Sequence, residues 1–143
     1  MIAAVVTRLN ATVVDLYGRV EGAAEFTDLM QRNDLPQATP AAFVLPLGLA
    51  GQQADAMAGA FTQAITETIG VVLVVRGHDR TGKRALERID QLIRDVIAAI
   101  IGWAPANEIG AFKLMRGQLI GLRAGALLYQ IDFAISDQLR STS

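Results

Sequence analysis

The chain has 143 residues, a net charge of −1 and a hydrophobic fraction of 52%. This length is the size of one domain. The net charge near zero excludes a surface field of one sign that would concentrate nucleic acid. A chain of this length buries about 68–70% of its unfolded surface, so it folds without disulfides or a structural metal. It has no cysteine, which excludes thiolate nucleophiles, and no apolar run near the length of a membrane-spanning helix.

The chain opens with a predicted helix over residues 2–13. Its apolar residues recur at the spacing of one helical face, and they are Ile2, Val5, Val6, Leu9 and Val13. Residues 19–26 are ambiguous, because they fit a short strand followed by a helical turn around Phe26. Residues 31–40 contain two prolines and are predicted to be a linker.

Two strands separated by a loop are predicted next. Residues 41–47 form an apolar strand, which must end at Pro46 or lie at a sheet edge because proline cannot donate a ladder hydrogen bond. Residues 48–59 are small, polar and rich in glycine, so we expect a mobile loop. Residues 61–76 predict a longer strand with a bend or bulge near Gly70, and antiparallel pairing of the two strands is the natural arrangement.

The clearest helix is predicted between a turn at residues 77–82 and the helix breakers Gly102 and Pro105. Its apolar residues form one wide stripe, and the charged residues lie mostly off that stripe. The stripe consists of Leu86, Ile89, Leu92, Ile93, Val96, Ile97, Ile100 and Ile101.

Three strands are predicted in the last third, over residues 111–115, 119–122 and 127–135, with turns at Arg116-Gly117 and Ala124-Gly125. In the third strand, alternation places one set of side chains inward, and Gln130 and Asp132 outward. The inward set is Leu127, Tyr129, Ile131, Phe133 and Ile135.

The order of these elements predicts an α+β fold. We expect a mostly antiparallel sheet with two main helices packed on one face. Residues 1–143 are predicted to be a single domain, with residues 140–143 as a flexible tail.

No set of side chains in the sequence points to catalysis or metal binding. The single histidine, His78, lies in a polar turn, whereas such sites need several convergent groups. Residues 77–84 come close to a phosphate-binding loop, but Arg84 stands where the pattern needs the hydroxyl that binds magnesium. We therefore expect no enzyme activity, no cofactor and no metal site. Nucleotide binding through residues 77–84 is a remote alternative.

Three segments carry a resemblance to a known family. Residues 43–48 read Phe-Val-Leu-Pro-Leu-Gly, residues 70–76 form the valine-rich strand, and residues 117–119 lead into Tyr-Gln-Ile-Asp-Phe at 129–133. With these segments in this order, the sequence resembles the tail terminator proteins, or tail completion proteins, of long-tailed bacteriophages. The resemblance implies a small α+β subunit that assembles as a hexameric ring. That ring caps the tail tube, stops its growth and joins the tail to the head.

The partners implied by this resemblance are further copies of the chain, the tail tube protein and a head–tail connector protein. DNA would pass through the lumen without sequence-specific binding, and no membrane is involved. The chain would be assembled in the host cytoplasm and reside in the tail or neck of the virion. Only 19% of the residues are charged, so few charged side chains cover the surface, which favours burial of apolar surface between subunits. A head-side connector or head-closure ring is an alternative.

Contacts to the tail tube or to a neighbouring subunit are predicted at the loop of residues 48–59 and along the sheet. Ordering of this loop on the tube would gain contacts that offset the entropy it loses. The predicted contact residues are Leu47, Leu49, Gln52, Gln53, Asp55, Met57, Arg76 and Arg116.

Overall fold

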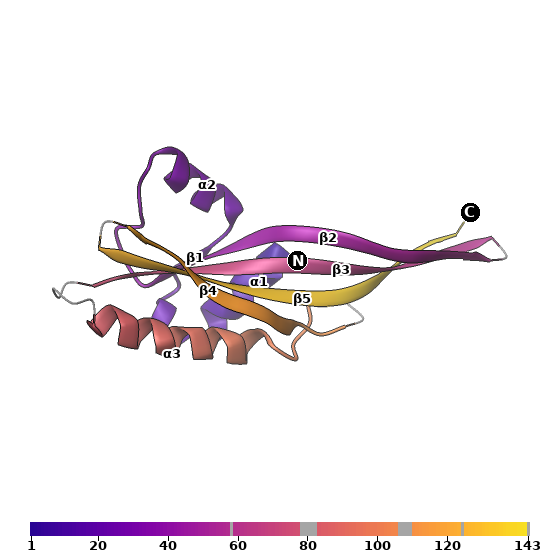
Figure 1. The fold of residues 1–143 in the computed structure, drawn as a ribbon. Coiled ribbons are helices and arrows are strands. Elements are labelled where there is room, and N and C mark those ends of the chain that lie inside the picture. The colour runs from indigo at the N-terminus through magenta and orange to yellow at the C-terminus, as the bar shows by residue number, and fades with distance from the viewer. Residues whose placement is uncertain (58, 78–82, 106–109, 124, 143) are drawn as a thin grey trace.

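Figure 1 shows the fold of the chain in a computed structural model, which describes residues 1–57, 59–77, 83–105, 110–123 and 125–142. Three helices lie beside one long sheet. In chain order the elements are α1 (Ile2–Thr12), the 3-10 helix η1 (Val14–Leu16), β1 (Val20–Glu21), α2 (Ala23–Gln31), β2 (Ala41–Met57), β3 (Ala60–Arg76), α3 (Lys83–Ile100), β4 (Lys113–Arg123) and β5 (Ala126–Thr142).

The strands form a single sheet in the order β1-β2-β3-β5-β4. β1 pairs with β2 in parallel, whereas β2 with β3, β3 with β5 and β5 with β4 pair antiparallel. This arrangement confirms the predicted α+β fold with a mostly antiparallel sheet.

The helices α1 and α3 cover one face of the sheet (Figure 1). Val5 and Leu9 of α1 and Leu92 and Val96 of α3 are buried in one hydrophobic core with sheet residues such as Leu73. Each helix places its apolar residues at intervals of three or four, so the same side returns to the sheet at every turn. The two main helices were predicted on one face, and this is confirmed. We call this face of the sheet the helix face.

The helix α2 packs on the opposite face, which the sequence left ambiguous. Phe26 and Leu29 contact a second core that contains Phe43, Val74 and Leu128. The rings of Phe26 and Phe43 lie 5.3 Å apart between centroids. Successive strand residues point to opposite faces, so the central strands are buried on both sides where α2 and α3 flank them.

The predicted loop at residues 48–59 is wrong as secondary structure. Residues 48–57 continue β2 and pair with residues 60–68 of β3, with register shifts after Pro46 and after Gly51. The small polar residues of this segment show no period-two pattern, but β3 offers backbone partners along most of its length. The mobility of the segment stays a prediction. In the same way, residues 140–142 pair with β3 rather than forming a tail without structure.

The bulge expected near Gly70 lies in the neighbouring strand. β3 keeps an unbroken register with β5 from Ala60 to Arg76, whereas β2 is irregular between Pro46 and Gly48. The extra residue of β2, Leu47, lies over Gly70. A Cβ atom added to Gly70 would be 2.9 Å from Leu47 Cδ1, so the glycine makes room for the bulged side chain.

The last third of the chain forms two strands instead of the predicted three. The turn expected at Arg116-Gly117 is wrong, because β4 continues through both residues. Two register shifts interrupt β4, one between Leu114 and Arg116 and one between Leu119 and Gly121. Such bulges permit a glycine-containing segment to remain in the sheet while its twist increases.

Three strands extend beyond the helices as an arm, which Figure 1 shows to the right of the helices with the C-terminus near its end. We define the arm as residues 48–57 of β2, 60–68 of β3 and 136–142 of β5. No helix of the described residues is long and apolar enough to cross a membrane.

Candidate assembly surface

An open cleft of about 340 Å³ lies between α2, β1 and residues 33–40. Its charged side chains hold the surrounding chain in place. Arg19 donates to the carbonyl oxygens of Pro40 and Thr39 at 3.0 Å and 3.2 Å. Arg32 pairs with Asp28 and Asp34. These interactions stabilise the segment before β2, so the charged side chains around the cleft are explained by the fold and do not indicate a binding site.

No group of His, Asp or Glu side chains within the described part of the chain is placed to hold a metal ion. His78 and the rest of residues 78–82, which form most of the candidate phosphate-binding loop, lie outside the described residues. Gly77, before this gap, donates its N–H to the carbonyl of Gly125 at 3.1 Å, and Lys83 begins α3.

The strand β4 lies at one end of the sheet and presents a row of exposed apolar side chains. Leu122 is 71% exposed, Met115 53% and Leu119 52%. Leu114 and Ile120 are exposed as well. An edge strand carries unpaired N–H and C=O groups, and natural proteins normally protect such strands with charges or a covering segment. An exposed apolar row on a free edge is therefore typical of a surface that another chain covers.

The strand β2 has an open edge on the other side of the sheet. β1 pairs only with Ala42 and Phe43, so on the side away from β3 the remainder of β2 has no strand beside it within the described residues. Leu49 is 66% exposed and Leu47 is exposed too. Pro46, which was predicted to end the strand or lie at an edge, lies on this open edge. In the part of the chain that the structure describes, the sheet thus has two different free edges, both with exposed leucines.

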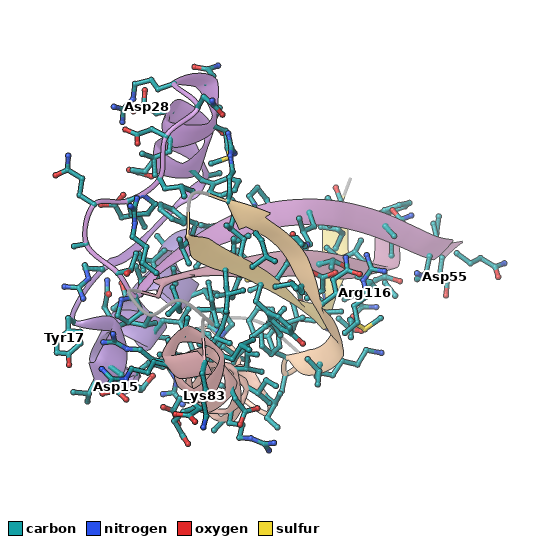
Figure 2. The ribbon with its side chains drawn as sticks, turned by 60° about the vertical axis from the view of Figure 1, so that its left-hand side comes forward. Asp15, Tyr17, Asp28, Asp55, Lys83 and Arg116 are labelled. Carbon is teal, nitrogen blue, oxygen red and sulfur yellow. The ribbon has the colours of Figure 1, made fainter. Side chains whose placement is uncertain are left out.

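The two edges carry opposite charge. β4 contains three basic residues, Lys113, Arg116 and Arg123, and no acidic residue. The only charged residue of β2 is Asp55. Figure 2 shows Asp55 towards the outer end of the arm and Arg116 on β4, both away from Asp15, Tyr17 and Lys83 on the helix side of the body. The charges are therefore arranged so that the edge of one copy would attract the opposite edge of another.

Arg116 is held by a partly buried ion pair on the face away from α1 and α3. Its Nε atom lies 3.2 Å from Oδ2 of Asp132, whose side chain is 10% exposed. Gln130 donates to the other carboxylate oxygen of Asp132 at 2.8 Å. This arrangement orients the Arg116 side chain at the edge of the sheet.

Six of the eight predicted contact residues lie between residues 47 and 57, along the open edge of β2. Of these, Gln52, Gln53 and Asp55 are exposed. Arg116 lies at the opposite edge of the sheet. Arg76 lies elsewhere, because its backbone N–H donates to Thr39 Oγ1 and its side chain donates to the carbonyl of Pro36. Contact through these eight residues stays a prediction, and Met57 is described only in its backbone.

The apolar row of β4 was not among the predicted contact residues. Leu114, Met115, Leu119, Ile120 and Leu122 belong to a segment that was interpreted as two strands around a turn. The signal that could have found them is the number of large apolar residues in a strand that also carries three basic ones. A buried strand of an ordinary sheet would not tolerate those charges.

The chain was compared with known proteins. The family model described as phage tail terminator protein matches residues 2–143. A chain in a solved structure described as "Virion of native gene transfer agent (GTA) particle" superposes with a TM-score of 0.56 and 14% sequence identity. The match covers 97% of this chain and 95% of that chain, and at this identity it shows a shared fold. No curated protein sequence matches the chain.

Proposed function

Because the chain belongs to the phage tail terminator family, we propose that it is a structural protein of the virion that forms a ring, a hexamer by resemblance to its family. The ring caps the tail tube, ends its growth and joins the tail to the head. It works through surfaces between proteins and catalyses no reaction.

The observation that carries this proposal is the pair of unlike free edges on one sheet. A contact between two different surfaces of identical chains is heterologous, and repetition of such a contact gives either a closed ring or an open fibre. The exposed leucines at both edges and the opposite charges of β4 and β2 support a contact of this kind. Closure into a ring then depends on the angle between neighbouring copies.

The arm is the part of the chain that supports a contact with the tail tube. It extends beyond the helices (Figure 1). Near its end, Phe61 and Leu139 are partly exposed on the helix face of the sheet. The other face of the arm carries mainly small or polar residues, among them Thr62, Thr66 and Ser136. Exposed apolar side chains at the end of a projecting segment are typical of a surface that packs on a second protein.

A light-scattering measurement and a tube-growth assay test the proposal together. The purified chain should form a particle of defined mass, alone or on tubes of the same virus. Its addition to polymerising tube protein should shorten the tubes, with the chain found at one tube end by electron microscopy. A Phe61→Ser variant should cap tubes less well, whereas Leu86→Ser on the exposed side of α3 should behave as the unchanged chain.

Binding to tube ends also separates this function from the head-side alternative. A head-closure ring would bind the head connector and leave tube growth unchanged. A chain that stays monomeric and never binds tube ends would refute the proposal. Passage of DNA through the lumen requires no sequence preference, so filter binding to different DNA sequences should show none.

A further inference from the structure

We infer that β4 of one copy pairs antiparallel with residues 45–55 of β2 in the next copy, so that the sheet continues from subunit to subunit. The pairing rests on the proposed ring and names the surfaces that hold it together. Its centre places Leu119 of one copy directly opposite Leu49 of the next.

The strand directions fit this pairing. Along the sheet from β2 through β3 and β5 to β4, each neighbour runs antiparallel to the one before. β4 therefore runs opposite to β2 within one copy. When a rotation about a ring axis close to the strand direction brings the next copy alongside, its β2 meets β4 as an antiparallel partner. The alternation of strand direction continues unbroken across the contact.

The faces of the sheet select the register. Residues that pair directly across a sheet point to the same face. Leu49 is opposite Glu67, in the row of β3 that contains Ile65 and Ile69, and this row points to the helix face. Leu119 is opposite Tyr129, in the row of β5 that also points to that face. A continuous sheet must place Leu119 opposite a helix-face residue of β2, and Leu49 is the exposed leucine of that row.

The irregularities of the two strands then fall together. In β2 the extra residues are Leu47 and the pair at 52–53, with a regular stretch of residues 48–51 between them. In β4 they are Met115 and Ile120, with a regular stretch of residues 116–119 between them. With Leu119 opposite Leu49, each irregularity of β4 lies within about one residue of an irregularity of β2. Bulges usually prevent pairing at an edge, but here both edges bend at the same places.

The same register brings complementary side chains together. It places Lys113 directly opposite Asp55, with both side chains on the face away from α1 and α3. At the other end it places Leu122 opposite Pro46. The whole of β4 is then aligned with residues 45–55 of β2. The charge pair was used to choose neither the strand direction nor the register, so it supports the pairing independently.

Cross-linking tests the register, because the chain contains no cysteine of its own. Leu49→Cys and Leu119→Cys each change an exposed residue. When the two single variants are mixed, mild oxidation or a short bismaleimide should join them as a heterodimer. Directly opposite residues bring their Cβ atoms to about 4.5–5.5 Å, close to disulfide range. A chain with both substitutions should give a ladder of covalent oligomers.

The matched control is Leu49→Cys mixed with Gln118→Cys. Gln118 is the neighbour of Leu119 but points to the opposite face, so this mixture should cross-link far less. Equal cross-linking through Gln118→Cys overturns the register. Homodimers of Leu119→Cys alone overturn it as well, because they indicate a symmetric contact of β4 with β4. So does the absence of any cross-link in an assembled particle.

A charge swap gives a second, independent readout. Asp55→Lys and Lys113→Glu should each weaken association about two- to five-fold per contact, as expected for an exposed pair, and the double variant should recover. A double variant as weak as either single variant overturns the pairing. If light scattering shows a ring that responds to neither test, the proposed ring stands and this pairing fails. A chain that forms no ring on tubes refutes both.

Discussion

Replacement of Leu119 and Leu122 by serine should dissociate the assembly while leaving the folded subunit intact. In the isolated subunit these side chains are 52% and 71% exposed, so their removal takes little from the core. In the assembly both would be covered by the β2 edge of the next copy. The double variant thus distinguishes apolar burial between subunits, which affects association, from apolar burial within one subunit, which affects its stability.

The size of the effect follows from the area that is still exposed. Full burial of a leucine side chain contributes about 1.5–3 kcal/mol, so two leucines that are each more than half exposed contribute together about 2–4 kcal/mol per contact. This corresponds to an association constant roughly 30- to 1,000-fold lower per contact. The free energy of unfolding of the subunit should change by no more than about 0.5–1 kcal/mol, the usual range for exposed strand positions.

Light scattering over a range of protein concentrations measures the association, and urea unfolding of the dissociated subunit measures its stability. Leu86→Ser is the control, since Leu86 is 54% exposed on α3 and lies outside the proposed contact. An assembly that keeps its mass in the double variant would contradict a role for β4. A loss of subunit stability as large as that of a core substitution would show that the exposed row supports the fold instead.

Two further predictions, each with a control substitution, concern the fold that presents these edges. Leu9→Ala removes a fully buried side chain of α1 and should lower the free energy of unfolding by about 2–5 kcal/mol in urea titrations, whereas Val14→Ala, 77% exposed, should change it little. Gly110→Ala should destabilise by about 1–3 kcal/mol, because the new Cβ would lie 2.6 Å from the backbone oxygen of Ser136. Gly121→Ala has open space around the new Cβ, so thermal unfolding should show no comparable loss, and an equal loss would contradict the steric argument.

The helices show how far the pattern of apolar residues leads. The apolar stripe between the turn at residues 77–82 and Gly102 predicts α3 within a residue or two of its observed bounds, because a helix that covers a sheet must repeat its apolar residues every three or four positions. The valine-rich half of β3 is equally clear, since a strand buried on both faces is apolar at every position. These elements depend on local spacing, which the sequence displays directly.

The arm and β4 show where local spacing fails. The segment 48–57 is small and polar, and it is a strand because β3 lies beside it. In β4, Arg116 and Gly117 are typical of a turn, yet the ladder of β5 holds them in the sheet. The backbone hydrogen bonds of both segments come from the adjacent strand of a hairpin rather than from within the segment, and the spacing of residues inside one segment does not record that partner.

The sequence alone determined the α+β class, the two main helices, the valine-rich central strand and the resemblance to the tail terminator family. Each of these depends on the order and periodicity of residues. Tertiary structure decided which strands form the edges of the sheet, and with them the exposed row of Leu114, Leu119 and Leu122 opposite the open edge at Leu49. An edge is defined by the absence of a neighbouring strand, which is a property of strand order rather than of any one segment.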